Sequence, residues 1–115
     1  MSDLLLQIAG GLAVAISLIH GVLGETKIFA KAKIEPAWIK LMLRFIWQCS
    51  TLAWISCGVL LIAAPYLGAP ARGWIVAISV INFLYAAAGN AWATRFRHIG
   101  WVAMTLASGL AIAGL

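Results

Sequence analysis

Charged residues are scarce in this sequence, and acidic residues are the scarcest of them. Only 10% of the 115 residues are charged, three are aspartate or glutamate, and 64% are hydrophobic. A soluble domain carries about 25% charged and roughly 45–50% apolar residues. Because a domain of this size leaves much of its surface uncovered, water cannot be the solvent around this chain. The composition predicts a single all-α integral membrane domain covering residues 1–115.

Cysteine is also rare, and the two cysteines cannot form a disulfide with each other. Cys49 and Cys57 lie on one predicted helix, which separates them by about 12 Å, whereas a disulfide needs Cα atoms about 4.4–6.8 Å apart. Neither cysteine belongs to a CxxC motif, and no cluster of histidine, cysteine and carboxylate indicates a zinc or copper site. No metal ligand is predicted.

Motifs of catalysis and of nucleic-acid binding are missing too. The chain has no nucleophile elbow, HExxH, glycine-rich phosphate loop or paired carboxylates, so no catalytic residue is assigned and an enzyme is a disfavoured class. The formal charge is +5, but the basic residues flank apolar runs, whereas a nucleic-acid binder arrays them along a soluble face. No nucleic-acid partner is expected.

Long apolar runs are what the sequence has in abundance. The first, residues 4–23, contains no charge and can cross a hydrocarbon layer of about 30 Å. Asp3, with no basic residue before the run, distinguishes it from a secretory signal. Pro36 suits a first helical turn, whereas Pro65 and Pro70 cannot continue a helix. The prediction is a four-transmembrane-helix bundle with helices at about 4–24, 37–64, 73–93 and 99–115.

Basic residues gather at two of the connections, in or beside residues 26–35 and just before residue 99. By the positive-inside rule, both termini then face away from the cytoplasm, across a bacterial inner membrane. The segment 26–35 is predicted to be a basic amphipathic loop, which is solvated near anionic lipids, lies in the headgroup layer or prolongs the first helix. The residues expected to contact lipid headgroups are Lys27, Lys31, Lys33, Arg95, Arg97 and His98.

The sequence contains an internal echo. Residues 14–20 read VAISLIH and residues 76–82 read VAISVIN, and both lie in odd-numbered helices that cross in the same direction. A weaker echo links SCGVLLIAA in the second helix to ASGLAIAGL in the fourth. One interpretation is a two-plus-two internal repeat that frames a transport site. The other is chance similarity within a restricted apolar alphabet.

The few polar side chains within the helices fall on stripes of residues three or four apart. Because a charge at the bilayer centre costs about 2.5–3.5 kcal/mol, these stripes should turn inwards. Glu25 is the only acidic residue near Arg44, so we expect the two to pair, and we expect His20 to bond to Gln48 or Asn82. The predicted polar interior, a substrate or proton site, consists of His20, Glu25, Arg44, Gln48, Asn82 and Asn90.

Each of these residues also has a structural interpretation. The pair of Glu25 and Arg44 can be a clamp between helices, and His20 can be a satisfied interior histidine. Asparagines within helices can act as interhelical glue. A ladder of small residues on the first helix should let another helix approach closely; it consists of Ala9, Ala13, Ser17 and Gly21.

Three functional hypotheses remain. The first is transport or conduction of a small solute or a proton, by a homo-oligomer, because so short a chain cannot enclose a pathway alone. The second is a non-catalytic accessory or scaffold subunit of a larger membrane complex. The third is a haem-binding bundle with His20 as axial ligand. It is the weakest, because bundle haem usually takes two ligands from facing helices and Gln48 stands where the second would be natural. No cofactor is assigned.

Two short motifs carry a resemblance. HGVLGE at the end of the first helix and LRFIWQ in the second resemble a group of small uncharacterised bacterial four-span membrane proteins that read H-x3-GE and then R-x2-WH. The matching residues are His20, Gly24, Glu25, Arg44 and Trp47. Gln48 replaces the second histidine of that pattern, which argues further against haem. The resemblance implies a four-span fold and no particular activity.

Overall fold

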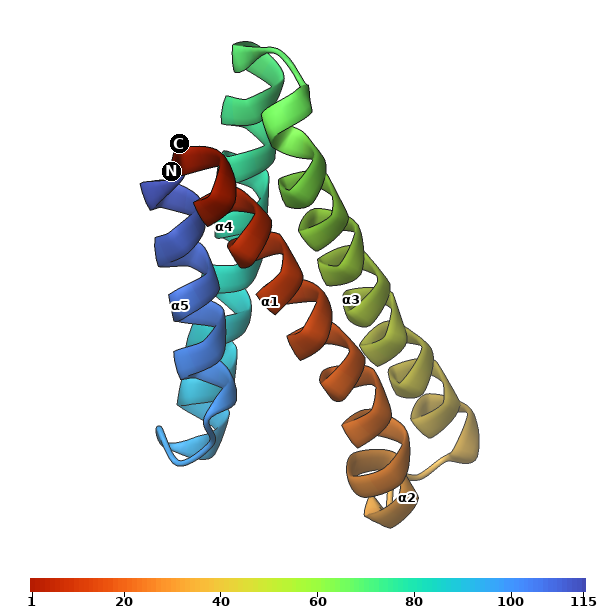
Figure 1. The fold of residues 1–115 in the computed structure, drawn as a ribbon. Coiled ribbons are helices and arrows are strands. Elements are labelled where there is room, and N and C mark those ends of the chain that lie inside the picture. The colour runs from red at the N-terminus through yellow and green to blue at the C-terminus, as the bar shows by residue number, and fades with distance from the viewer.

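The chain folds into helices and short connections, with no strand, in a computed structural model that describes residues 1–115 (Figure 1). Helix α1 (Ser2–Leu23) continues without a break through a π-helical segment (Gly24–Ile28) into the short α2 (Phe29–Lys31). A short connection leads to α3 (Ala37–Ala63), which ends in a 3-10 turn (Ala64–Tyr66). The last two helices are α4 (Ala69–Thr94) and α5 (Gly100–Ala113).

Three of the helical rods are long and apolar enough to cross a membrane. Ser2–Lys31 and Ala37–Tyr66 have 30 residues each, and Ala69–Thr94 has 26. The prediction of an all-helical chain built on long apolar helices is therefore confirmed. The last helix is shorter than the expected range 99–115, because α5 has 14 residues. Its length of about 21 Å is less than the about 30 Å of a hydrocarbon layer.

The structure corrects two of the predicted boundaries. Of the alternatives for residues 26–35, the structure has the one in which the segment prolongs the first helix: the first rod is helical as far as Lys31, and only residues 32–36 connect it to the second. Helix α4 begins at Ala69 rather than at residue 73, with Pro70 in its first turn. A proline is tolerated there because the missing N–H would have had no helical partner.

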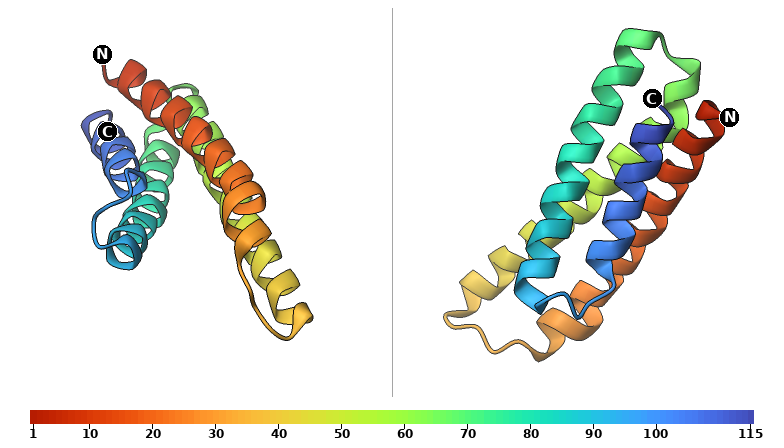
Figure 2. Two further views of the ribbon diagram at one scale, coloured as in Figure 1. Left: turned by 90° about the horizontal axis from the view of Figure 1, so that it is seen from below. Right: turned by 90° about the vertical axis from the view of Figure 1, so that its left-hand side faces the viewer.

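The four rods form two pairs that meet at one end and diverge at the other (Figures 1 and 2). Helix α1 packs along α3, and α5 packs along α4, while contacts of α1 with α5 and of α3 with α4 join the pairs. Both chain ends lie where the pairs meet, and the segment around α2 lies at the open end. The termini are therefore far from the lysines of α2 and of the connection after it.

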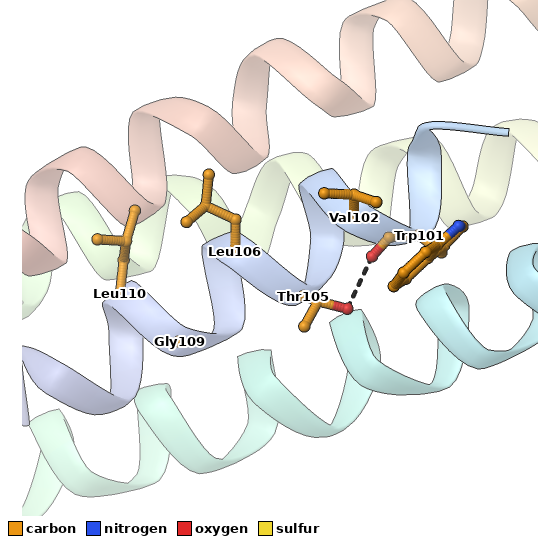
Figure 3. Close-up of a pocket in the computed structure, with 6 residues that line it drawn as sticks. All are labelled: Trp101, Val102, Thr105, Leu106, Gly109 and Leu110. Atoms are coloured by element: carbon orange, nitrogen blue, oxygen red, sulfur yellow. Dashed lines mark hydrogen bonds between the residues drawn. The ribbon is translucent and has the colours of Figure 1, made fainter. Parts of the chain in front are cut away.

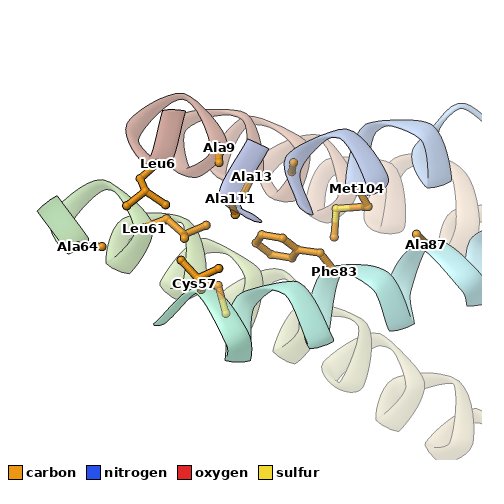
Figure 4. Packing of buried hydrophobic residues seen from close by; sticks show 12 residues of the cluster. Leu6, Ala9, Ala13, Cys57, Leu61, Ala64, Phe83, Ala87, Met104 and Ala111 are labelled. Carbon is orange, nitrogen blue, oxygen red and sulfur yellow. The ribbon is translucent and has the colours of Figure 1, made fainter. Parts of the chain in front are cut away.

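The core lies where the two pairs meet and consists mainly of small and apolar side chains (Figure 4). Phe83 of α4 and Met104 of α5 are the large side chains at its centre. Ser17 and Ser108 are buried as well, and each hydroxyl donates to the carbonyl one turn back on its own helix, which satisfies these two donors locally. Small residues at the contact positions let the helices approach closely.

Helices α1 and α3 come closest at Gly10 and Gly58. A Cβ atom added to Gly10 would lie 2.4 Å from the carbonyl oxygen of Gly58, and one added to Gly58 would lie 2.8 Å from the carbonyl oxygen of Gly10. The backbones are thus in direct contact. The ladder of small residues on α1 faces other helices as predicted, because Ala9, Ala13 and Ser17 are all buried.

Arg72 ties both ends of the chain to the start of α4. Its Nη1 donates to Asp3 Oδ1 over 2.8 Å, and its Nη2 donates to the Gly114 carbonyl over 2.8 Å and to Ser2 Oγ over 3.2 Å. The Arg72 side chain is only 19% exposed. No role was predicted for this residue, and in the structure it clamps the two termini.

Replacing Arg72 by methionine should therefore loosen this end of the bundle. A hydrogen bond to a charged group contributes about 1.5–3 kcal/mol, so the free energy of unfolding in detergent should fall by about 2 kcal/mol. Arg97→Met, in the exposed connection between α4 and α5, is the control and should unfold like the parent. Equal denaturation curves for the two variants would show that the clamp contributes nothing.

Candidate functional site

The expected ion pair of Glu25 and Arg44 is present between α1 and α3, at the end of the molecule where the two helix pairs diverge. Arg44 Nη2 donates to Glu25 Oε2 over 2.6 Å, and Gln48 Nε2 donates to Oε1 of the same carboxylate over 3.1 Å. Both carboxylate oxygens of α1 are thus held by α3. The side chains of Glu25 and Arg44 nevertheless remain 41% and 44% exposed, so water or a small solute can reach them.

The backbone of the first rod is distorted at the same place, where α1 gives way to the π-helical segment Gly24–Ile28. Just before it, the His20 carbonyl accepts a hydrogen bond from Trp47 Nε1 over 2.9 Å, and the Gly21 carbonyl accepts one from Gln48 Nε2 over 3.0 Å. A π turn shifts the helical hydrogen bonds by one residue, and donors from α3 pair with the carbonyls beside it. Because positions 44, 47 and 48 share one face of α3, a single face supplies all these contacts.

His20 lies about one helical turn before the Glu25 cluster on α1, where it packs against two tryptophan rings. Its ring stacks on Trp47 with centroids 4.1 Å apart and planes 5° apart, and the Trp54 ring lies 4.4 Å away at 50°. His20 Nε2 lies 3.0 Å from Ser50 Oγ. Because the Ser50 hydroxyl already donates to the Trp47 carbonyl, Nε2 must be the donor to Ser50, which leaves Nδ1 of the neutral ring as a free acceptor.

The prediction that His20 bonds to Gln48 or Asn82 is wrong, because Ser50 is the partner. Gln48 uses its amide nitrogen on Glu25 and on the Gly21 carbonyl. The Asn82 amide nitrogen donates over 2.9 Å to the Ile78 carbonyl of its own helix. Asn82 lies on the face of α4 opposite the buried one, and α4 itself diverges from the α1–α3 pair (Figure 2), so Asn82 does not reach the cluster.

Asn90 belongs to a different place, the turn between α4 and α5. Its Oδ1 accepts a hydrogen bond from the Trp101 backbone N–H over 3.1 Å, and its Nδ2 lies 3.3 Å from His98 Nδ1. The first N–H groups of a helix have no partner within the helix, so Asn90 caps the start of α5. Four of the six predicted interior residues therefore lie together, and Asn82 and Asn90 do not join them.

Trp47, Ser50 and Trp54 belong to the site and were not predicted as part of it. All three lie on α3, at spacings of three or four residues from each other or from Gln48. The usable signal was the position of Trp47 and Trp54, which the predicted span 37–64 places away from its ends, where an aromatic belt would be expected. A tryptophan in that position needs an acceptor for its N–H, and the His20 carbonyl provides one for Trp47.

The residues predicted to contact lipid headgroups are all exposed, and contact with lipid stays a prediction. They are Lys27, Lys31, Lys33, Arg95, Arg97 and His98. His98 has a structural role as well, because its Nδ1 accepts a hydrogen bond from the Gly100 backbone N–H over 3.0 Å at the start of α5.

The two best-formed hollows on the surface are open, and neither is lined by the polar cluster. One, of about 400 Å³, runs along α5 and is lined by Trp101, Val102, Thr105, Leu106, Gly109 and Leu110 (Figure 3). The other, of about 260 Å³, is lined by Leu18, Ile19, Val22 and Leu23 of α1. No ionisable side chain lines either of them, so neither offers a charged solute a path from the cluster through one copy of the chain.

Comparisons with protein-family models, with curated proteins and with solved structures found no match to this chain. The chemistry of the cluster therefore has to be inferred from its own geometry. It combines an accessible carboxylate, a guanidinium that can release that carboxylate to a competing cation, and an imidazole with a free nitrogen one turn deeper. Such groups can bind a small ion or accept a proton.

Proposed function

We propose that this chain is a multi-pass protein of the bacterial inner membrane, and that as a homo-oligomer it moves a small solute or a proton through a polar site at its cytoplasmic side. The observation that carries the proposal is the cluster of Glu25, Arg44 and Gln48 between two helices long enough to cross a membrane. Ionisable residues in such helices are costly, and they usually mark pathways for ions or protons.

The shape of the molecule and its exposed aromatic residues support membrane insertion. Its principal extents are 48 × 26 × 18 Å, so the long axis exceeds a hydrocarbon layer of about 30 Å and its ends can reach both headgroup regions. Trp38 and Trp92, near the basic ends of their helices, are 64% and 87% exposed, and Tyr66 and Trp74, near the opposite ends, are 79% and 70% exposed. This placement matches two aromatic belts. Helix α5 is too short to cross alone and packs against α4 and α1.

In this proposal, Glu25 is the entry group. Arg44 neutralises its carboxylate at rest, and an incoming cation or proton competes with the guanidinium for the same oxygen atoms. His20, one turn deeper, can take up a proton on Nδ1 while Ser50 holds the ring through Nε2. Because neither of the two best-formed hollows carries side chains from this cluster, the rest of the pathway would form between copies.

The test is proton flux into proteoliposomes that enclose a pH-sensitive dye, driven by a potassium diffusion potential. The parent should acidify the lumen faster than empty vesicles, and Glu25→Gln should reduce that excess rate by about tenfold or more, the usual size of a proton-transfer contribution being at least about 100-fold. Arg97→Ala, an exposed residue outside the cluster, is the matched control and should behave as the parent. A panel of monovalent ions and small cationic solutes extends the measurement beyond protons.

A second candidate, a non-catalytic accessory subunit of a membrane complex, is favoured by one specific observation. Glu25, Arg44 and Gln48 satisfy one another and join α1 to α3, which is what a purely structural clamp would do. The vesicle experiment separates the two candidates. If the parent is folded and oligomeric in the vesicles but moves none of the panel above background, the accessory role replaces transport.

A further inference from the structure

Helix α4 has two faces, and only one is used within the chain. Its inner face is buried in the bundle and consists of Val76, Ser79, Phe83, Ala87 and Ala91. The other face carries Ile78, Tyr85 and Trp92, which are 52%, 84% and 87% exposed. Gly89 lies on the same face, and a Cβ atom added there would meet nothing within 4 Å. This second face is open along most of the helix.

The open face follows a heptad repeat. Ile78, Asn82, Tyr85, Gly89 and Trp92 are separated by four, three, four and three residues, the spacing of the positions that face the partner in a left-handed helix pair. A glycine in such a stripe lets two backbones approach closely. In this register Asn82 occupies a contact position, where a single asparagine is known to specify alignment and partner number.

Asn82 is also a polar side chain whose hydrogen-bonding groups are only partly paired within its own bundle. It lies at the middle of α4, with residues 69–81 before it and residues 83–94 after it. Its amide nitrogen donates to the Ile78 carbonyl, and its Oδ1 makes no hydrogen bond within the chain. The Tyr85 hydroxyl, one turn away on the same face, is likewise without a partner in the chain while the side chain is 84% exposed.

If α4 spans the bilayer as proposed above, these two groups lie near the bilayer midplane, where lipid offers no hydrogen-bond partner. We infer that the Ile78–Asn82–Tyr85–Gly89–Trp92 face of α4 is the surface on which a second copy of this chain docks. The inference rests on the proposed membrane insertion and identifies one interface of the proposed oligomer, a surface separate from the cluster of Glu25, Arg44 and Gln48.

A second copy fits this face better than an unrelated partner, because copies inserted in the same orientation place their α4 helices parallel about a two-fold axis. Each residue then meets its own counterpart at the same depth. Asn82 faces Asn82 of the other copy, so the amide of one can donate to the Oδ1 of the other. Side chains on a helix point towards its N-terminus, so the Tyr85 hydroxyl of each copy reaches back to the level of that pair.

Disulfide trapping in membranes tests the surface. In a chain with Cys49→Ala and Cys57→Ala, the substitution Ile78→Cys should give a covalent dimer on mild oxidation. Leu52→Cys on α3 and Leu106→Cys on α5 are the controls, since those side chains are 66% and 55% exposed against 52% for Ile78. Dimer formation at Ile78 should exceed that at either control by about tenfold, the ratio that a 1.4 kcal/mol preference for one face produces.

Blocking the face gives an independent measurement without new cysteines. Gly89→Leu adds bulk where the single chain has open space, so the fold should persist while the dimer fraction in detergent falls by about tenfold or more. Gly109→Leu is the matched control, a helical glycine on α5 with equally open surroundings, and should leave the dimer intact. Asn82→Leu should weaken the dimer too, although it makes the face more apolar.

The outcomes are distinguishable. Equal trapping at all three cysteine positions, trapping at a control only, or a monomer with all variants alike would each overturn the inference and leave lipid as the cover of this face. Extraction of the membranes with alkaline carbonate is run on the same samples. If the chain resists extraction but does not dimerise through α4, only the proposed interface is refuted. If carbonate releases the chain, the proposed membrane function is refuted, and the interface with it.

Discussion

Replacing Gly10 by alanine should separate α1 from α3 and destabilise the chain more than any surface change. The added methyl group would lie 2.4 Å from the Gly58 carbonyl oxygen and 2.9 Å from the Ile62 backbone nitrogen. Both obstacles are backbone atoms of a regular helix, so they cannot rotate out of the way as a side chain can. Overpacking typically costs about 1–3 kcal/mol and occasionally more, and we expect the upper end of that range, about 3 kcal/mol, in detergent unfolding.

The neighbouring glycine, Gly11, is the control, because its replacement by alanine should change the stability in the opposite direction. A Cβ atom on Gly11 would meet nothing within 4 Å, and alanine is favoured over glycine within a helix by up to about 1 kcal/mol. Gly11→Ala should therefore unfold at the same or a slightly higher denaturant concentration than the parent. If Gly10→Ala and Gly11→Ala shift the midpoint alike, the close crossing of α1 and α3 is wrong.

Removing the ring of Trp47 should open the polar cluster. The ring donates to the His20 carbonyl, stacks on the His20 imidazole and receives the edge of Phe29, with centroids 5.8 Å apart. It also lies directly on Gly24, since a Cβ atom added there would clash with the indole. Truncation of a buried tryptophan to alanine costs about 3–5 kcal/mol. Because Trp47 is only half-buried, we expect about 3 kcal/mol for Trp47→Ala.

Two further variants divide that loss into its causes. Trp47→Phe keeps an aromatic ring over His20 but loses the N–H donor, so it should cost about 1 kcal/mol, the net value of one hydrogen bond. Trp38→Ala removes a tryptophan of the same helix that is 64% exposed, and should leave the unfolding midpoint near that of the parent. If Trp38→Ala lowered the free energy of unfolding as much as Trp47→Ala, the Trp47 ring would stabilise the fold through its buried surface alone and not through its bonds to α1.

The internal echo stays a prediction, although the two segments share a pattern of exposure. Ser17 and Ser79, which occupy the same place in VAISLIH and VAISVIN, are both buried, and His20 and Asn82 at the ends of the segments are both half-buried. The two end residues differ in their surroundings. His20 is enclosed by Trp47 and Trp54 of α3, whereas Asn82 bonds only to its own helix.

The amino-acid sequence by itself determined the helical class, the long apolar rods and the pairing of Glu25 with Arg44. The first two follow from composition and from the spacing of prolines and charges, which are local properties. The pair was predictable because one acidic residue and one arginine lay at matching ends of consecutive helices, and the other nearby acidic residue, Glu35, precedes Pro36 in the connection, outside the helix that carries Arg44. Scarcity of charge left a single solution.

Only the tertiary structure decided which of the other polar residues meet. Asn82 lies on the face of α4 opposite the buried one, which keeps it away from His20, and the choice of Ser50 as the partner of His20 depends on how α3 is rotated about its axis. The π-helical turn at Gly24 and the clamp of Arg72 on Asp3 and Gly114 join segments by contacts that helical periodicity does not encode. The physical reason is that a polar group takes the nearest partner that packing allows, and packing is a property of the whole bundle.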